Sequence, residues 1–214
     1  MRVFFAEAAP LELALCWADG LWSEKRARVL RMRHDSDKAL ALTAHRLLCF
    51  AVKTVHGLGL QPENFALEPQ GKPYLSAYPN IHFSISHSGS MAMCALHDSA
   101  VGADIEKLRD VGAGVAERVM TADELRVYAN TSDKQSFFFQ VWTLKEAYIK
   151  YRGEGLSLPM RSFSAHPLDG GISTDTECAF WSAEPAPGYQ AAVCARRITH
   201  PQAAMVDVRQ LERM

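Results

Sequence analysis

Apolar residues recur at helical spacing over residues 36–55, which predicts a long helix. Gly57 and Gly59 follow and predict its end, because glycine readily takes the left-handed conformation that closes many helices. Ser23–Arg33 and Lys134–Tyr151 show similar spacing, and the second of these is the strongest helical pattern in the chain. We therefore expect main helices in both halves of the sequence.

Strands are predicted where apolar residues alternate with small or polar ones between turn-forming residues. The segments are Met1–Ala6, Phe65–Glu68, Lys72–Leu75, Ile81–Ser86, Met91–His97 and Val101–Glu106. Thr121 and Glu124 form a capping-box pair, which predicts the start of a short helix. The C-terminal third contains further short strands interrupted by Pro and Gly. Helices and strands mixed in this order predict an α+β protein.

The two halves of the chain repeat a similar order of patterns. A helix, then G-x-G-L, a proline and a Phe-led strand occur in HRLLCFAVKTVHGLGLQPENFAL from His45 and in TLKEAYIKYRGEGLSLPMRSFSA from Thr143. FSISHSGSMAMCAL from Phe83 likewise resembles FWSAEPAPGYQAAVCA from Phe180. Duplication of one α+β unit would explain both, with chance similarity of short apolar strings as the alternative. A duplicated chain would place a ligand cleft between its halves, because pockets favour such interfaces.

Composition and charge narrow the possible functions. The chain has 214 residues, 48% hydrophobic and 22% charged, and a formal net charge of −1, which argues against general nucleic-acid binding. Its five cysteines include no C-x-x-C and predict free thiols in a reducing compartment, without a zinc cluster. The apolar N-terminal stretch is interrupted by Glu7, Pro10 and Glu12, so we predict a cytoplasmic protein with no membrane partner.

Two acidic residues lie near the end of the predicted strand VGADIE. Asp104 and Glu106 are two positions apart, so they share one face of a strand, while Val101, Ala103 and Ile105 face the core. Two carboxylates on one face suit a hard divalent cation such as Mg²⁺, which prefers oxygen ligands and is commonly shared with substrate phosphates. The alternative is a strand that emerges into solvent with two hydrated acids.

The helix motif WTLKEAYIK carries Lys145, Glu146 and Lys150 among apolar neighbours. Glu146 and Lys150 are four residues apart and share a face, so an ordinary exposed ion pair is the simplest interpretation. However, so apolar a helix is expected to be mostly buried, and buried charges need partners. A metal ion for Glu146 and a phosphate for the two lysines would supply them.

Other residues suggest phosphate binding. His87 lies in a Ser-His-Ser-Gly turn, where the hydroxyls of Ser86 and Ser88 and local amides could bind a phosphate oxygen, although a structural histidine is the alternative. A cluster of basic residues near the start, with two more further on, comprises Lys25, Arg26, Arg28, Arg31, Arg33, Arg46 and Lys72. This cluster predicts either a solvated helix face or a clamp for a phosphate-rich ligand, since Arg binds phosphate in bidentate geometry.

Together these motifs resemble those of a known family. VGADIE followed by WTLKEAYIK resembles the paired signature of the 4′-phosphopantetheinyl transferases, G-x-D-x-E and W/F-x-x-K-E-x-x-x-K. GKPYL, FSISHSG, GEGLSLP and GYQAAVCA are similar to further motifs of the longer, surfactin-synthetase-activating type. The resemblance covers roughly residues 20–197 and rests on six motifs in the right order. Thr143 and Ser84 depart from the commoner residues, but neither is among the acidic positions.

The resemblance implies a fold and a reaction. The expected fold is α+β, with two similar α/β halves that form a pseudo-two-fold monomer. We place these halves at residues 1–102 and 103–214, the second carrying the metal site, with coenzyme A in the cleft between them. The implied reaction transfers the 4′-phosphopantetheine group of coenzyme A to a serine of an apo acyl or peptidyl carrier protein and releases adenosine 3′,5′-bisphosphate.

The resemblance also implies a role for individual positions. These are binding of Mg²⁺ or Mn²⁺ by Asp104, Glu106 and Glu146, pyrophosphate contact by Lys150, nucleotide and phosphate contact by Lys72 and His87, 3′-phosphate contact by Lys25, Arg28 and Arg46, and a further contact by Ser86. Glu146 is the candidate base for the carrier serine, directly or through water. The segment Lys107–Asp123 is expected to meet the carrier, with apolar Val111, Val115, Val119 and Met120 beside Arg109 and Arg118; a loop that only covers the core is the alternative.

Two other classes of function remain compatible with the sequence. One is a coenzyme A- or nucleotide-binding regulator without catalysis, against which the presence of all three acids and Lys150 argues. The other is a metal-dependent phosphoesterase in which water replaces the carrier serine. Fatty-acid, polyketide, nonribosomal-peptide and siderophore carriers all fit the transferase interpretation.

Overall fold

The computed structural model describes residues 1–213. Its helices are α1 (Leu11–Leu15), α2 (Ser23–Leu30), α3 (Asp35–His56), α4 (Val115–Val119), α5 (Ala122–Asn130), α6 (Lys134–Arg152) and α7 (Val208–Glu212). Its strands are β1 (Arg2–Glu7), β2 (Phe65–Leu67), β3 (Pro73–Leu75), β4 (His82–Ser88), β5 (Met91–His97), β6 (Val101–Lys107), β7 (Ala165–Leu168), β8 (Gly171–Thr174), β9 (Ala179–Ala183), β10 (Tyr189–Ala195) and β11 (Gln202–Met205). Within this range no helix is both long and apolar enough to cross a membrane.

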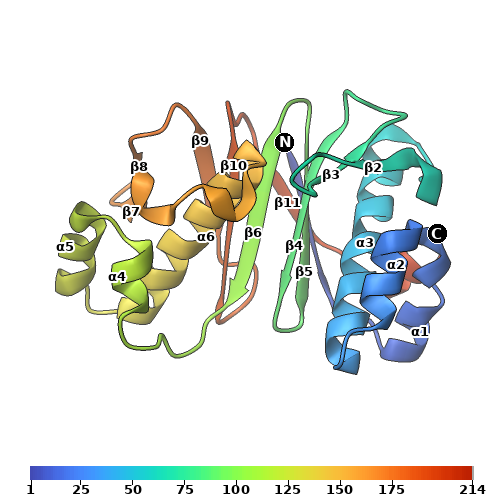
Figure 1. Ribbon diagram of the computed structural model, residues 1–214, viewed down its shortest axis with the longest axis horizontal. Helices are drawn as coiled ribbons and strands as arrows, with labels where there is room; N and C mark the ends of the chain where they lie inside the picture. The colour runs from blue at the N-terminus through green and yellow to red at the C-terminus, as the bar shows by residue number, and fades with distance from the viewer. Residues whose placement is uncertain (214) are drawn as a thin grey trace.

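Two sheets face each other, and one long helix covers the outer side of each (Figure 1). The first sheet has the strand order β11-β1-β5-β4 and packs against α3, while the second has the order β6-β10-β9 and packs against α6. An apolar layer fills the space between the sheets and includes Val3, Phe5 and Met93 from the first and Ala103 and Val193 from the second. The two halves are therefore joined by a shared core.

Both halves have the same topology. In the first half β5 lies between β1 and β4, and in the second half β10 lies between β6 and β9. All four of these strand pairs are antiparallel. In both halves, the long helix leads into a short strand, β2 or β7. This repeated order confirms the α+β class with two similar halves. The division between residues 102 and 103 stays a prediction.

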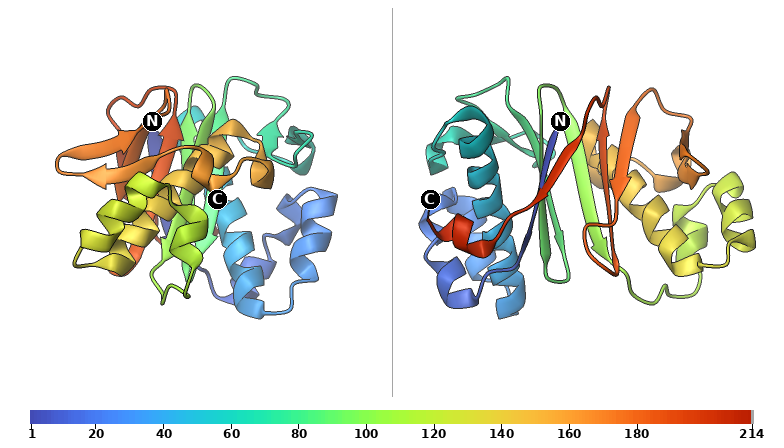
Figure 2. Two further views of the ribbon diagram at one scale, coloured as in Figure 1. Left: turned by 60° about the vertical axis from the view of Figure 1, so that its left-hand side comes forward. Right: turned by 180° about the vertical axis from the view of Figure 1, so that it is seen from behind.

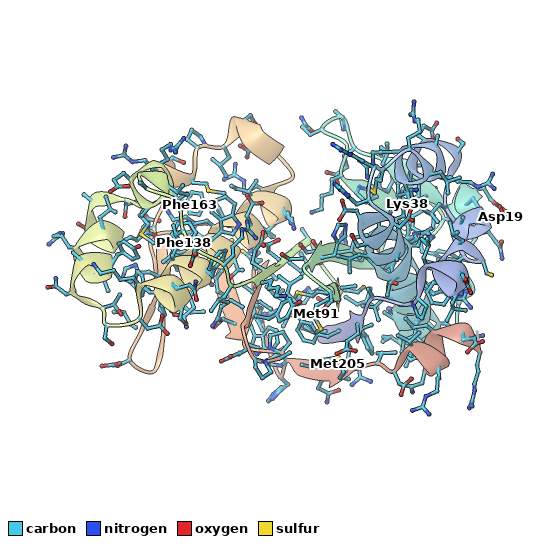
Figure 3. The ribbon with its side chains drawn as sticks, turned by 90° about the horizontal axis from the view of Figure 1, so that it is seen from below. Asp19, Lys38, Met91, Phe138, Phe163 and Met205 are labelled. Carbon is cyan, nitrogen blue, oxygen red and sulfur yellow. The ribbon has the colours of Figure 1, made fainter. Side chains whose placement is uncertain are left out.

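The C-terminal segment returns to the first half (Figure 2). Strand β11 pairs in parallel with β1, and Leu211 of α7 is fully buried in the core that surrounds α3. From below, Phe163 lies in one lobe, Lys38 in the other and Met91 between them (Figure 3). The sequence pattern predicted short strands in this region but did not predict α7.

Local sequence rules explain the ends of the two long helices. Gly57 and Gly153 follow α3 and α6 in the left-handed conformation, with φ of 72° and 69°. At the start of α6, the Asp133 carboxylate accepts a hydrogen bond from the backbone N–H of Ser136 at 2.9 Å. The predicted helices over 36–55 and 134–151 are confirmed to within one residue at each end.

Candidate active site

Strand β6 and helix α6 are in direct backbone contact at Gly102. A Cβ atom at this position would lie 2.0 Å from the carbonyl oxygen of Ala147 and 2.3 Å from the amide nitrogen of Tyr151. Only glycine allows the helix backbone to lie so close to the strand. Asp104 and Glu106 follow at alternate positions, so their side chains leave β6 on the face that α6 covers.

The alternation along β6 is confirmed by burial. Val101, Ala103 and Ile105 are at most 1% exposed and lie in the apolar layer between the sheets. On the opposite face Asp104 is only 4% exposed, and Glu106 is half-buried. Asp104 is therefore not a hydrated surface acid, and its charge requires a partner within the protein or its ligand.

Lys150 on α6 is the cationic partner of one of the two Asp104 oxygens. Its Nζ donates to Asp104 Oδ1 at 2.6 Å and to Ser86 Oγ at 2.9 Å, and Ser86 Oγ donates to the same Oδ1 at 2.7 Å. The other oxygen, Asp104 Oδ2, is buried and has no hydrogen-bond partner among residues 1–213. Because an unpaired buried carboxylate oxygen is costly, this atom presents an acceptor position for a cation or ligand.

Glu146 lies one helical turn before Lys150 on α6. Burial raises the pKa of the Glu146 carboxyl, and the negative charges of Asp104 and Glu106 raise it further, while Lys150 opposes them. Three carboxylates therefore lie within mutual electrostatic range. A carboxyl group with a raised pKa is better matched to accepting a proton near neutral pH.

The fit of these groups to a divalent ion can be judged from their contacts. In the described chain, no three His, Cys, Asp or Glu side chains are arranged to hold a metal ion as they stand. Lys150 pairs with Asp104, and Arg109 Nη1 pairs with Glu106 Oε2 at 3.1 Å. The unpartnered Asp104 Oδ2 and the repulsion that raises the Glu146 pKa nevertheless fit a cation, which would relieve both.

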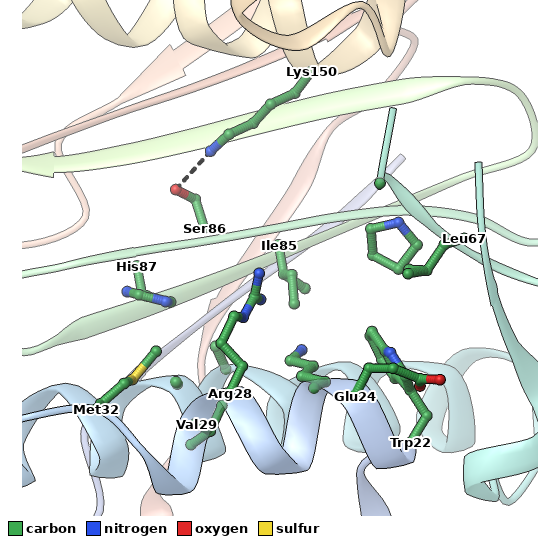
Figure 4. A pocket seen from close by; sticks show the side chains of 15 residues that line it. Trp22, Glu24, Arg28, Val29, Met32, Leu67, Ile85, Ser86, His87 and Lys150 are labelled. Atoms are coloured by element: carbon green, nitrogen blue, oxygen red, sulfur yellow. Dashed lines mark hydrogen bonds between the residues drawn. The ribbon is translucent and has the colours of Figure 1, made fainter. Parts of the chain in front are cut away.

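A cavity of about 460 Å³ opens between α2, β4 and the C-terminal part of α6 (Figure 4). Five of the predicted site residues line it, namely Lys25, Arg28, Ser86, His87 and Lys150. In Figure 4, Lys150 reaches toward Ser86 from one side while Arg28 rises from α2 on the other. The fold thus gathers cationic side chains from both halves of the chain around one cavity.

The electrostatics of this cavity favour an anion. Lys25 is 7% exposed, and burial, together with the charge of Arg28, lowers its pKa to about 8. Partial desolvation also lowers the pKa of His87, and the charges of Lys150 and Lys25 lower it further. Both shifts reflect positive charges that lie close together, although only Lys25 is buried and His87 is exposed. An anionic ligand that entered the cavity would stabilise these charges.

Two of the predicted phosphate-binding residues lie outside this cavity. Lys72 lines a neighbouring cavity of about 310 Å³ together with Glu146 and Lys150, and its Nζ donates to the carbonyl oxygens of Lys150 at 2.6 Å and Val101 at 3.2 Å. Arg46 is directed elsewhere, since its Nε donates to the carbonyl oxygen of Leu211 at 2.9 Å. Arg46 is not among the residues that line the cavity with Lys25 and Arg28.

Lys145 faces away from the cavity, so the prediction that it binds phosphate is wrong. Its side chain is fully buried, pairs with Glu124 Oε2 at 2.9 Å and donates to the carbonyl oxygens of Met160 and Phe163. Glu124 also accepts the backbone N–H of Ala165 at 2.7 Å. The ion pair and this hydrogen bond connect α6 to α5 and β7. The capping-box pattern predicted the position of Glu124 at a helix start but not its pairing with Lys145.

Comparison with known proteins identifies the family. Residues 100–194 match a family model described as the 4′-phosphopantetheinyl transferase superfamily. The chain is 35% identical over 188 residues to the 4′-phosphopantetheinyl transferase ffp of Bacillus subtilis, which covers 84% of both chains. It is 33% identical over 187 residues to the 4′-phosphopantetheinyl transferase Sfp of Bacillus subtilis strain 168, again covering 84% of both.

A third relative and a solved structure extend this comparison. The 4′-phosphopantetheinyl transferase psf-1 of Bacillus pumilus is 33% identical over 182 residues, covering 81% of this chain and 78% of that protein. The holo-[acyl-carrier-protein] synthase of Thermotoga maritima overlaps 44% of this chain and 61% of its own, with 19% identity and a TM-score of 0.39. The three relatives, each at least 33% identical over most of this chain, show that the chain is an enzyme of the transferase class. It belongs to the 4′-phosphopantetheinyl transferase family, of the Sfp-like type.

Proposed function

We propose that this enzyme transfers 4′-phosphopantetheine from coenzyme A to a serine of an apo carrier protein, with Mg²⁺ or Mn²⁺, and releases adenosine 3′,5′-bisphosphate. One observation carries the proposal. Lys150 lines the cationic cavity and at the same time pairs with the buried Asp104, so a phosphate site and an acidic cluster meet at a single side chain. Phosphoryl transfer needs both, because negative charge on the transferred and leaving phosphates must be neutralised while the attacking hydroxyl gives up its proton.

The residues of the cavity divide into two groups by position. Lys25 and Arg28 on α2 bind the 3′-phosphate of the nucleotide, where an arginine can engage two phosphate oxygens. His87, Ser86 and Lys150 lie on the opposite wall, next to the carboxylates, and bind the pyrophosphate. Lys72 lies behind this wall and orients it through its bonds to two backbone carbonyls.

The carboxylates have two roles, which are to bind the metal ion and to accept the proton of the carrier serine. Asp104, Glu106 and Glu146 would bind Mg²⁺, which when present neutralises charge on the pyrophosphate oxygens. Glu146 accepts the proton of the carrier serine, directly or through a water molecule, and its raised pKa supports that role. Lys150 neutralises charge on the departing nucleotide phosphate. One chain supplies both walls of the site, which supports action as a monomer.

The carrier protein docks on the segment Lys107–Asp123, which directly follows the strand that bears Asp104 and Glu106. Val111 and Val115 are partly exposed there, beside the exposed Arg109 and Arg118. A mixture of apolar and positive groups suits an acidic partner surface. The docking surface consists of these four residues, since Val119 and Met120, which the sequence pattern also suggested, are buried in the core around α6.

The transfer is tested by incubating the chain with coenzyme A, Mg²⁺ and a panel of apo acyl and peptidyl carriers, followed by intact-mass measurement. We expect at least one carrier to gain the mass of one phosphopantetheine group. Coenzyme A binding without any gain in carrier mass would favour a non-catalytic binder instead. Release of adenosine bisphosphate without a carrier would favour a phosphoesterase.

The pKa of Lys25, about 8, predicts how nucleotide affinity depends on pH. A bound 3′-phosphate stabilises the charged lysine, so affinity is highest below pH 8 and falls as the pH rises through that value. Between pH 7 and pH 9 we expect the dissociation constant for adenosine 3′,5′-bisphosphate to rise by up to about tenfold. Calorimetric titration at these pH values measures it, and this probe avoids the titrating thiol of coenzyme A.

A substitution separates Lys25 from other titrating groups. Lys25→Arg keeps its charge across this range, so its dissociation constant should stay nearly flat between pH 7 and pH 9. The same steep rise in the Lys25→Arg variant would assign the titration to another residue. Folding stability should change in the opposite direction, because the unfolded chain, with an ordinary lysine pKa of 10.5, binds more protons above pH 8.

A further inference from the structure

Strands β4 and β6 are edge strands of different sheets and run side by side where the halves meet. Serines at three alternate positions of β4 face β6, and each makes a hydrogen bond across this seam. The bonds are Ala103 N–H to Ser84 Oγ at 2.9 Å, Ser86 Oγ to Asp104 Oδ1 at 2.7 Å, and Ser88 Oγ to Glu106 Oε2 at 2.6 Å. Side chains therefore join the two sheets here.

The two acids of β6 are held in parallel ways. Asp104 Oδ1 accepts from Ser86 and from Lys150, and its second oxygen has no partner within residues 1–213. Glu106 Oε2 accepts from Ser88 and from the cation of Arg109. In the described chain the bonds to Glu106 all go to Oε2, which leaves Oε1 open. Each carboxylate thus has one fixed oxygen and one free oxygen.

The contact between Ser88 and Glu106 is the stronger of the two contacts that Glu106 makes. Ser88 is half-buried, and its Oγ also accepts the backbone N–H of Lys107 at 3.2 Å, which fixes the direction of its own hydrogen. Arg109 is 62% exposed and is screened by water. The orientation of the Glu106 side chain therefore depends chiefly on Ser88.

We infer that Ser88 is a positioning residue for the metal ligand Glu106: its hydroxyl holds Oε2 so that Oε1 is presented to the divalent ion. The inference rests on the proposed function, because it needs Glu106 to bind that ion. Hydrogen-bond partners that orient a metal ligand typically contribute 10-fold to 100-fold to metal affinity. Ser88 is not among the residues that line the cationic cavity.

A purely structural role is the competing explanation, and Ser84 offers the matched control. It lies on the same strand and crosses the same seam, but it accepts from a backbone N–H and touches no carboxylate. If these serines only join the halves, removing either one should lower thermal stability without a specific effect on metal binding. If Ser88 positions Glu106, only its removal should weaken the metal site.

The test measures Mn²⁺ binding to the full chain by electron paramagnetic resonance, with adenosine 3′,5′-bisphosphate present and no carrier. We expect Ser88→Ala to raise the Mn²⁺ dissociation constant about tenfold, and Ser88→Cys to do nearly the same because a thiol is a weak donor. Ser88→Thr, which restores a hydroxyl, should stay within about twofold of the parent. Ser84→Ala should also stay within about twofold.

Kinetics provide a second measurement. In Ser88→Ala the Mg²⁺ concentration for half-maximal rate should rise about tenfold, while kcat at saturating Mg²⁺ changes less than about twofold. An unchanged Mn²⁺ constant in both Ser88→Ala and Ser88→Cys, or an equal shift in Ser84→Ala, would overturn the inference and leave the transferase proposal intact. Failure of the parent chain to modify any carrier, with the Mn²⁺ shift present, would overturn the proposed transfer alone.

Discussion

Replacing Asp104 with Asn is expected to lower the rate of phosphopantetheine transfer by about 10³-fold while the fold stays intact. The amide has the same size as the carboxylate, so Ser86 and Lys150 keep an acceptor at the position of Oδ1. What disappears is the negative charge, including that on the buried Oδ2 that has no partner within residues 1–213. Loss of one strongly engaged electrostatic group in an enclosed site costs about 10² to 10³ in rate.

The expected effect on stability is small by comparison. Lys150 is about one-third exposed and can turn toward water when its ionic partner is removed. In the parent enzyme the negative charge of Asp104 repels Glu146 and raises the pKa of the Glu146 carboxyl. Asp104→Asn removes this repulsion. We therefore expect the melting temperature to change by no more than about 5 °C, whereas transfer almost disappears.

The matched control for this change is Asp98→Asn. Asp98 lies six residues earlier, in the turn before β6, and its side chain is 92% exposed. The Asp98→Asn substitution makes the same chemical change at a position outside the cavity, so the rate of transfer should remain at the parent level. The comparison is made by measuring kcat/KM for both variants with coenzyme A and one accepted carrier. An Asp104→Asn enzyme with more than about one-tenth of the parent rate would contradict the role of Asp104 in catalysis.

The part of the site that the sequence predicted is the part that local periodicity controls. On β6 the two-residue period fixes which side chains share a face, so Asp104 and Glu106 were correctly separated from Val101, Ala103 and Ile105. On α6 the four-residue spacing fixes Glu146 and Lys150 on one side. The repeated order of motifs also predicted two similar halves, and the two matching strand orders confirm this similarity.

The part that the sequence did not predict depends on contacts between distant segments. Lys145 and Lys150 look alike as basic residues of one apolar helix, yet Lys145 faces Glu124 and Lys150 faces Asp104. Lys145 is one residue from Glu146 and therefore about 100° around the helix, but this spacing does not indicate which acidic residue each lysine contacts. Arg46 shows the same limit, since its Nε donates to the carbonyl oxygen of Leu211, which lies in a C-terminal helix that the sequence pattern did not predict.

Ser88 illustrates a signal that was present in the sequence. Three serines at alternate positions of one strand share a face, which the two-residue period requires. A strand face that carries only small hydroxyls neither fills a core nor resembles a charged surface, so it predicts a polar seam. What periodicity could not supply is the identity of the neighbouring strand, because β4 and β6 belong to different sheets.

Replacing Gly102 with Ala is expected to lower both the stability of the fold and the rate of transfer. The added Cβ would meet the carbonyl oxygen of Ala147 at 2.0 Å and the amide nitrogen of Tyr151 at 2.3 Å, and both are rigid backbone atoms of α6. The helix would have to move away from β6, which disrupts its packing against the second sheet. Overpacking of this kind should cost about 4 kcal/mol in the free energy of unfolding, and lower the melting temperature by about 10 °C.

The same displacement moves the catalytic groups apart, which distinguishes Gly102→Ala from a substitution that only destabilises. Glu146 and Lys150 are carried by α6, so a shift of the helix lengthens the 2.6 Å contact between Lys150 and Asp104. Even well below the melting temperature, we expect transfer to fall at least 100-fold, because displacements of about 1 Å can have this effect. Gly59→Ala is the control, since a Cβ there meets no atom within 4 Å and should change neither property. A Gly102→Ala enzyme that melts and transfers like the parent would mean that α6 does not lie on β6, and the site built on that contact could not form.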